Sequence, residues 1–121
     1  MNPTQHTEAD TESQAAVFSA LADPTRLKLV KLLGRQRDPD ALCVNALASL
    51  LGVTQSAVSQ HLRVLRATGL VKGERRGYRV HYFINAEGMD HCRKLIFSAL
   101  SGYVDQGEEN LCQGLCPDTT K

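Results

Sequence analysis

The strongest constraint on the fold is a change of hydrophobic period within residues 42–85. Apolar side chains first recur at i, i+4 and i+7, as on one face of a helix, at Val58, Leu62 and Leu65. After Gly69 they recur at every second residue, which is typical of strands, over residues 70–72 and 78–83. The segment therefore predicts a helix followed by a β-hairpin, whose two strands flank residues 74–77.

A second helix is expected directly before this one. Its apolar face comprises Ala46, Leu47, Leu50 and Leu51. Gly52 can adopt the left-handed conformation that ends a helix, and the Thr54 hydroxyl can accept a hydrogen bond from a free amide of the next helix. Two helices joined by a short turn form a helix-turn-helix, and the hairpin would be its wing. The predicted fold is mainly α with a small β-hairpin (α+β), a winged helix-turn-helix.

Two more helices are expected before this unit. A short helix with an apolar face should cover residues 13–22, and Asp23 should cap the next helix, with Pro24 in its first turn. The side chains expected to point inward from that second helix include Leu27, Val30 and Leu33. Residues 35–40 are polar and should form a loop.

A last helix should follow the hairpin, from a cap at Asn85 through roughly residues 86–104. Its apolar stripe comprises Met89, Cys92, Leu95, Ile96, Ala99, Leu100 and Tyr103. The first and last helices together carry more apolar surface than one small winged helix needs to cover. We therefore expect a homodimer joined through these two helices.

Length and composition fit one small domain of a 121-residue chain. We expect a disordered polar arm at residues 1–12, the winged domain at residues 13–104 and a mobile, cysteine-containing tail at residues 105–121. No apolar run is long enough to span a membrane, and the first residues do not resemble a secretion signal, so a cytoplasmic protein is expected. Phosphate loops, nucleophile elbows and paired catalytic carboxylates are missing from the sequence, which argues against an enzyme.

The polar face of the second helix points to double-stranded DNA as the partner. It carries hydroxyl, amide and guanidinium groups, which hydrogen-bond base edges and phosphates. Residues 61–81 hold six Lys or Arg against one acid, although the whole chain has a net charge of only +1. The candidate DNA-binding residues are Thr54, Gln55, Ser56, Ser59, Gln60, His61, Arg63, Arg75, Arg76 and Arg79. The alternatives are a solvated basic surface or a winged helix used for protein–protein contacts, but the latter would favour Glu or apolar residues on this face.

The chain resembles the ArsR/SmtB family of winged-helix repressors. The resemblance rests on residues 21–33, on residues 41–71 and on RRGYRVHYFIN at residues 75–85. It implies a homodimer that binds operator DNA and is released by a metal ion, a metalloid or a redox signal. Because a two-fold dimer presents two recognition helices, the operator should be an inverted repeat.

The inducer site that the resemblance implies is only half present. Thiolate-sensing members read acid-Leu-Cys-Val-Cys-Asp-Leu where this chain has ALCVNAL, so Cys43 is retained while Asn45 and Ala46 replace the second cysteine and the acid. The tail offers Cys112 and Cys116 at i, i+4 spacing. Our hypothesis is a thiolate site of Cys43, Cys112 and Cys116 for a soft ion such as As(III), Cd(II), Pb(II) or Zn(II).

Other interpretations of the cysteines stay open. Cys92 is a further candidate ligand, but its place on the apolar stripe favours the core. The thiols could instead form a redox switch or take no part in sensing. The zinc site that some family members build on the last helix is not expected here, because Asp90 and His91 are adjacent and no later histidine follows. His81, in a wing strand, is expected to face solvent or phosphate.

Overall fold

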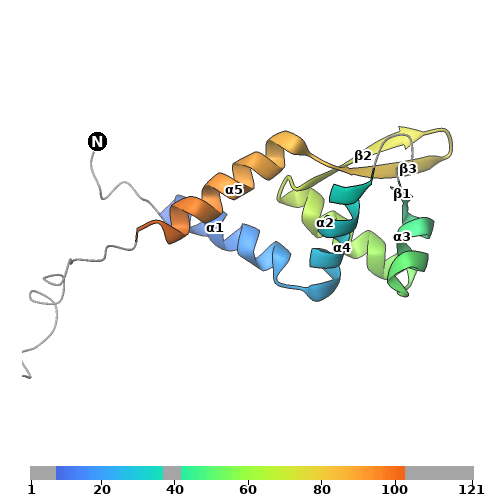
Figure 1. The fold of residues 1–121 in the computed structure, drawn as a ribbon, viewed down its shortest axis with the longest axis horizontal. Helices are drawn as coiled ribbons and strands as arrows, with labels where there is room; N and C mark the ends of the chain where they lie inside the picture. The colour runs from blue at the N-terminus through green and yellow to red at the C-terminus, as the bar shows by residue number, and fades with distance from the viewer. Residues whose placement is uncertain (1–7, 37–41, 103–121) are drawn as a thin grey trace, which may run out of the picture.

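The computed structural model describes residues 8–36 and 42–102. It is mainly α with one small antiparallel sheet, which confirms the predicted fold class, and the α1–α5 pair lies at the opposite end from the wing (Figure 1). The elements are α1 (Glu8–Leu21), α2 (Pro24–Arg35), β1 (Leu42–Cys43), α3 (Val44–Leu51), α4 (Gln55–Ala67), β2 (Val71–Arg76), β3 (Arg79–Ile84) and α5 (Ala86–Leu100). Within these ranges no helix is long and apolar enough to cross a membrane.

The helix boundaries around the helix-turn-helix follow the capping chemistry that the sequence predicts. The Asp23 carboxylate accepts hydrogen bonds from the amides of Thr25 and Arg26, at 2.8 and 3.1 Å. These donors, the Arg26 amide above all, lower the pKa of Asp23. Thr54 Oγ1 accepts from the Ala57 amide at 3.0 Å, and Gly52 ends α3 with a φ of 70°.

The core forms where α4 packs against α2, α3 and the base of the sheet at β2. The Leu and Val side chains that are less than 2% exposed are Leu29, Leu47, Val58, Leu62, Leu65 and Leu70. The prediction for α2 was partly wrong, because Leu27 is 40% exposed while Leu29 is fully buried. Leu29 and Leu33 stand four residues apart and therefore share the face of α2 that meets the core.

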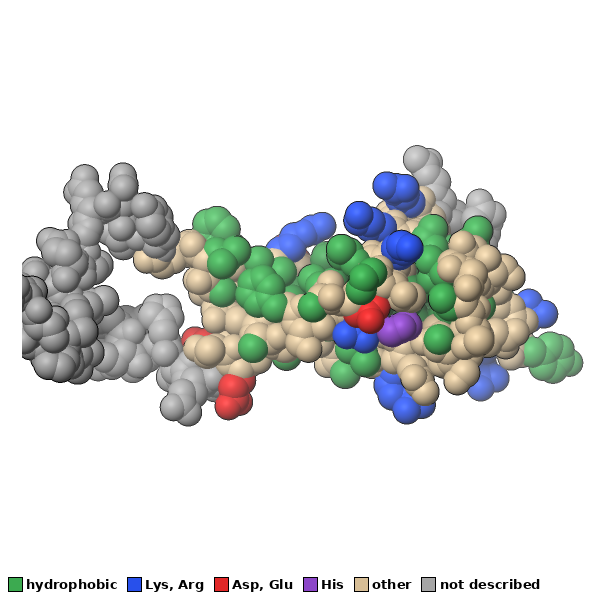
Figure 2. Space-filling view, turned by 90° about the horizontal axis from the view of Figure 1, so that it is seen from below, with side chains coloured by type: hydrophobic (Ala, Val, Ile, Leu, Met, Phe, Trp, Pro, Cys, Tyr) green, Lys and Arg blue, Asp and Glu red, His purple; other side chains and the backbone are tan. Residues whose placement is uncertain are grey.

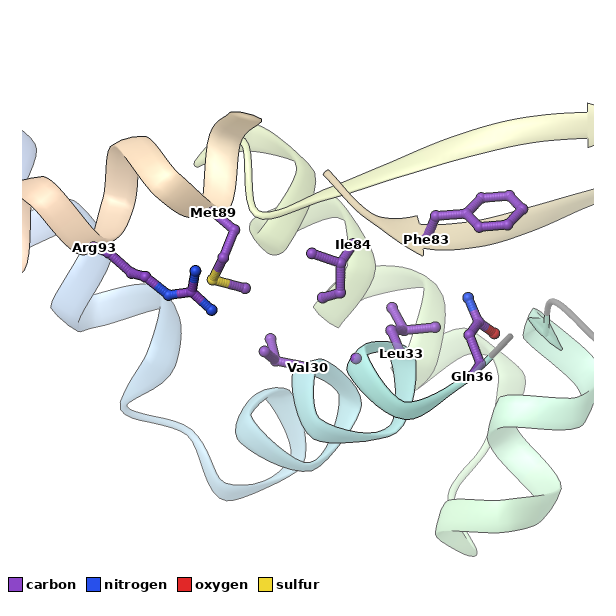
Figure 3. A pocket seen from close by; sticks show the side chains of 8 residues that line it. Val30, Leu33, Gln36, Phe83, Ile84, Met89 and Arg93 are labelled. Atoms are coloured by element: carbon purple, nitrogen blue, oxygen red, sulfur yellow. The ribbon is translucent and has the colours of Figure 1, made fainter. Parts of the chain in front are cut away.

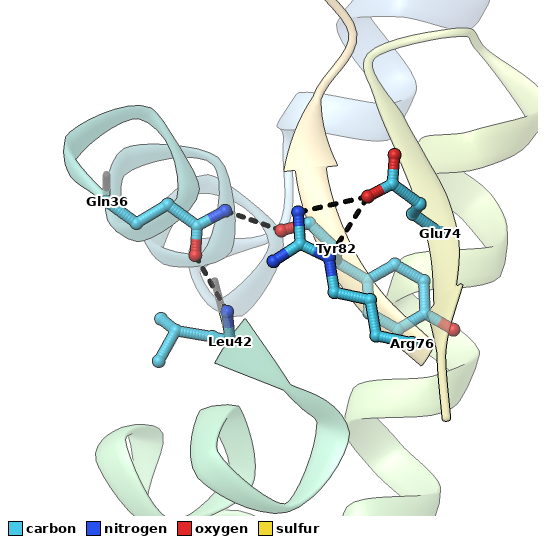
Figure 4. Close-up of polar contacts among 5 residues, drawn as sticks. All are labelled: Gln36, Leu42, Glu74, Arg76 and Tyr82. Carbon is cyan, nitrogen blue, oxygen red and sulfur yellow. Dashed lines mark hydrogen bonds and ion pairs between the residues drawn. The ribbon is translucent and has the colours of Figure 1, made fainter. Parts of the chain in front are cut away.

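A third strand, which no sequence pattern predicts, extends the sheet to the order β1-β3-β2. In β1, Leu42 pairs with Tyr82 and Cys43 with His81. Gln36, just after α2, holds this edge: its side-chain amide donates to the Tyr82 carbonyl and its Oε1 accepts from the Leu42 amide at 2.9 Å (Figure 4). Gln36, which directly follows α2, therefore holds the two-residue strand β1 against β3.

The wing is longer and tighter than predicted. β2 and β3 pair continuously from Val71 opposite Ile84 to Arg76 opposite Arg79. The predicted connection at residues 74–77 is therefore wrong, and the turn consists of two residues at 77–78. Gly77 has a φ of 68°, which suits the first central position of a two-residue hairpin.

The first helix starts earlier than expected. α1 begins at Glu8, so the predicted polar arm is corrected for residues 8–12, and residues 1–7 lie outside the described range. Acidic residues in the first turns of a helix interact favourably with its dipole, which explains why this polar segment continues the helix. α1 packs against α5, with Gln14 Nε2 donating to Ser98 Oγ at 3.4 Å.

α5 sits directly on the turn that ends the helix-turn-helix. Gly69 has a φ of 82°, and a Cβ on Gly88 would lie 1.7 Å from the Gly69 carbonyl oxygen. Only a glycine at position 88 permits this approach. Asn85 does precede α5 as predicted, but its side chain makes no capping hydrogen bond, while its amide donates to the Leu70 carbonyl at 3.0 Å. α5 ends at Leu100 rather than near 104, and Tyr103 lies outside the described residues.

Candidate DNA interface and thiol site

The polar face of α4 is open to solvent along its length. Ser56, Ser59, Gln60 and Arg63 are all exposed, while the opposite face of the same helix is buried. Gln55 is exposed as well, whereas the Thr54 hydroxyl is used for the cap. These side chains carry donors and acceptors suited to base edges and phosphates, and α4 is long enough to enter a major groove.

A cleft runs between α4 and β3 beside this face. Its volume is about 490 Å³, and it is lined by Ser59, Leu62, Arg63, Arg66, Ala67 and Tyr82. Two guanidinium groups along one wall suit a phosphate backbone. Arg66 and Tyr82 were missing from the predicted site, although the local basic charge that includes Arg66 was a signal for it.

The three arginines of the wing differ in the contacts that their guanidinium groups make. Arg75 is exposed. Arg76 is held against the wing by an ion pair to Glu74 at 3.0 Å (Figure 4). Its guanidinium also lies 4.9 Å from the centroid of the Phe83 ring. Arg79 is also exposed but points its guanidinium at a thiol, described below. Lys and Arg side chains gather mainly toward the end that holds the helix-turn-helix and wing, away from the α1–α5 end (Figure 2).

His61 occupies a different environment from its neighbours on α4. It is half-buried, and its Nδ1 lies 3.2 Å from Arg26 Nη1. The same guanidinium donates to the carbonyls of Ser19 and Ala20, at 3.2 and 2.7 Å. Arg26 thus ties the end of α1 to α4, and His61 has a positioning contact that sequence alone did not reveal.

Cys43 stands at the start of α3 and at the edge of the sheet. It is half-buried, and its Sγ accepts a hydrogen bond from Arg79 Nη1 at 3.8 Å. The Ala46 amide at the start of α3 contributes most to lowering the pKa of this thiol, and Arg79 adds to it against the opposing effect of burial. A cavity of about 240 Å³ opens beside it, lined by Cys43, Val44, Asn45, Arg79, Val80 and Tyr82.

The structure separates the other candidate sensor residues. Cys92 is buried, its Sγ donates to the Thr68 carbonyl at 3.5 Å, and burial raises its pKa, which agrees with the core role favoured above. His81 pairs with Cys43 across β1 and β3, and its Nδ1 is buried without a hydrogen-bond partner among the described residues, contrary to the solvent-facing role expected. Cys112 and Cys116 lie outside the described range. Within it, no three metal-binding side chains are grouped to hold an ion.

Comparisons with known proteins agree with this geometry. A family model described as "Bacterial regulatory protein, arsR family" matches residues 23–72. The "Transcriptional repressor SmtB homolog" of Synechocystis sp. is 49% identical over 71 residues, which are 59% of this chain and 51% of that protein. The chain therefore spans about half the length of this relative.

Two further matches cover more of their counterparts. The "Arsenic resistance transcriptional regulator ArsR1" of Pseudomonas putida is 33% identical over 77% of this chain and 67% of its own length. A solution structure of a "homodimeric winged helix-turn-helix DNA-binding domain" from Mycobacterium bovis is 26% identical, with a TM-score of 0.62 over 84% of this chain and 87% of that one. The family profile, the identities and the shared fold coincide on the helix-turn-helix, and the chain belongs to the arsR family of bacterial transcriptional regulators.

Proposed function

We propose that this protein is a transcriptional repressor that binds operator DNA in a sequence-specific manner through α4 and the wing. The observation that carries the proposal is the exposed face of Ser56, Ser59, Gln60 and Arg63 beside a cleft with two arginines. Phosphate contacts from the arginines would position the protein, and the amide and hydroxyl groups would distinguish bases. Glu or apolar side chains, which would suit a protein-binding face, are absent from these four positions.

The repressor would act as a two-fold dimer joined through α1 and α5. Large apolar side chains remain exposed on these two helices, with Phe18 40%, Phe97 73% and Leu100 67% exposed. Apolar side chains cluster at this end of the surface (Figure 2). The relative from Mycobacterium bovis is homodimeric. A dimer would place two α4 helices about one duplex turn apart, roughly 34–36 Å, so the operator would be an inverted repeat.

Selection from a library of randomised duplexes tests both parts of this proposal. The full chain should enrich an inverted repeat, and light scattering should give the mass of a dimer. Leu100→Glu places a charge on the proposed dimer surface and should yield monomers that enrich at most one half-site. Enrichment of no consensus sequence would refute DNA recognition, and a monomeric wild-type protein would refute the dimer.

The inducer site would be built around Cys43. We infer that Cys43, Cys112 and Cys116 together bind a soft metal or metalloid ion, because soft ions prefer thiolates. The lowered pKa of Cys43 supports this inference, since only the deprotonated sulfur is a ligand. A ligand bond at Cys43 would act at the start of α3, the first helix of the helix-turn-helix. The coupling expected of such a site is about 1–3 kcal/mol, or five- to 150-fold in operator affinity.

Cd(II) titration of the reduced protein tests this site. Sulfur-to-cadmium charge transfer should give an ultraviolet band that falls in Cys43→Ser, Cys112→Ser and Cys116→Ser, while Cys92→Ser should leave it unchanged. Each of the first three variants should still bind the operator but no longer release it with Cd(II). An unchanged band in the Cys112→Ser/Cys116→Ser double variant would exclude the tail.

A second candidate is a thiol-redox switch of the same fold. The observation that favours it is the Cys43 environment, since a thiol beside a cation and a helix N-terminus is more readily oxidised. Hydrogen peroxide would then release the operator without metal, and a thiol reductant would restore binding. Release of the operator by Cd(II) but not by peroxide would identify metal binding, and not thiol oxidation, as the signal.

A further inference from the structure

A groove that does not include Cys43 separates α2 from β3 and the start of α5. Its volume is about 480 Å³, within the range of small-molecule sites. The lining residues are Val30, Leu33, Gly34, Gln36, Phe83, Ile84, Met89 and Arg93. Figure 3 shows Arg93 at one end and Gln36 at the other, with Met89, Val30, Ile84 and Leu33 between them. The groove is thus elongated, apolar along its middle and cationic at one end.

Arg93 is the only ionisable side chain in the lining. Among the described residues it makes no hydrogen bond or ion pair, whereas the neighbouring Lys94 pairs with Asp90 at 3.3 Å. The other polar group, the Gln36 amide, is already engaged with the backbone of Tyr82 and Leu42. The guanidinium therefore has its donors available for an anion, and it forms bidentate hydrogen bonds best with a carboxylate.

The far end of the groove is connected to the wing. Phe83 lines the groove, and the same ring carries the guanidinium of Arg76 4.9 Å from its centroid. Gln36 lines the groove too and clamps β1 to β3. A ligand packed along this wall would contact both the support of a wing arginine and the edge on which Cys43 lies.

We propose that this groove is an effector site for a linear amphipathic carboxylate, with its head group on Arg93 and its alkyl chain along Val30, Ile84 and Met89. Charge complementarity fixes the head, and the apolar wall fixes the chain. Occupancy would shift Phe83 and Arg76 and so alter operator affinity. That regulatory part rests on the proposed function, whereas binding itself does not depend on DNA.

Methionine-methyl NMR of the full chain with sodium decanoate tests the binding directly. The chain has two methionines, Met1 and Met89, so the Met89 methyl reports on the groove and the Met1 methyl is an internal control. We expect a saturable shift of Met89 alone. Acetate, which lacks the chain, should cause none, and decanol, which lacks the charge, should bind more weakly.

Two variants separate the head group from the chain. Arg93→Gln should weaken decanoate at least about tenfold, the loss of one charge-assisted hydrogen bond, and bring it to the level of decanol. Gly34→Leu should block both ligands, because a Cβ on Gly34 meets nothing within 4 Å and the added side chain would fill the groove. Lys94→Gln, which removes a neighbouring charge outside the groove, should bind decanoate like the wild type.

Different results would overturn the binding site, its regulatory role or the proposed function. No shift of Met89, a parallel shift of Met1, or equal decanoate affinity in wild type and Arg93→Gln would overturn the site. A saturable Met89 shift with unchanged operator affinity would overturn its regulatory part alone. Failure of the chain to select any operator would refute the proposed function and leave the NMR result intact.

Discussion

The polar face of α4 and the edge around Cys43 are built in opposite ways. The α4 face lies on one helix, so its members are fixed relative to each other by helical spacing alone. The Cys43 edge needs α3 for its amides, β3 for Arg79 and His81, and Gln36 after α2 for the clamp that holds β1. A site on one element tolerates change elsewhere in the fold, whereas a site shared by several elements can respond to it. The α4 face is therefore suited to recognise DNA, and the Cys43 edge is suited to sense a signal.

The largest predicted effect is a loss of stability that should disturb both the α4 face and the Cys43 edge. Gly88→Ala would place a Cβ 1.7 Å from the Gly69 carbonyl oxygen and push α5 off the end of the helix-turn-helix. Thermal or urea unfolding should show a loss of more than about 2 kcal/mol in the free energy of unfolding. Gly34→Ala is the matched control, because its Cβ meets nothing within 4 Å, and it should not destabilise the protein. Equal stability of the two variants would show that the Gly69–Gly88 contact does not seat α5.

A smaller effect should separate the regions. Gln60→Ala should weaken binding to the selected operator by about 1–3 kcal/mol, because a bidentate amide contact to a base would be lost. Fluorescence anisotropy with the operator and with a scrambled duplex measures the change in discrimination. Alkylation of Cys43 should be unaffected in this variant. A parallel loss on both duplexes would assign Gln60 to the backbone instead of a base.

The wing offers a finer test of the DNA region. Arg75 is exposed, whereas Arg76 is already ion-paired to Glu74, so Arg75→Ala should lower DNA affinity more than Arg76→Ala. The loss should be similar for all sequences, and the dependence of log K on log salt should flatten by about one unit. A larger effect of Arg76→Ala would mean that Arg76 leaves Glu74 when DNA binds.

The smallest effect concerns the thiol edge alone. Because its pKa is lowered, Cys43 should be alkylated by iodoacetamide with a midpoint pH below that of an ordinary thiol. Arg79→Gln removes a stabilising donor, so the midpoint should rise and alkylation at neutral pH should slow several-fold. Peptide mass spectrometry gives the rate at each cysteine, with buried Cys92 as the slow reference. An unchanged Cys43 rate would show that the helix amides alone lower its pKa.

Sequence patterns predicted the parts of the fold that depend on neighbours along the chain. The Asp23 and Thr54 caps, the left-handed Gly52 and the buried stripe of α4 all follow from local chemistry, and all are confirmed. The exposure of the α4 face follows from the same period.

The features that were missed depend on contacts between distant segments. β1 is two residues long and carries no strand pattern of its own, since it forms only against β3 with the Gln36 clamp. His61 shares its helix with Gln60 but is held by Arg26, thirty-five residues earlier. The groove at Arg93 needs three elements, none of which has an unusual sequence.

The central claim is that the exposed face of α4 reads base pairs, and an altered-specificity experiment tests it most directly. Selection from one randomised duplex library should be carried out in parallel for the wild type and Gln60→Arg. Gln favours adenine and Arg favours guanine in the major groove, so the consensus should change from A·T to G·C at one position in each half-site and stay the same elsewhere. An identical consensus for the two proteins, which differ only in the residue at position 60, would contradict the claim.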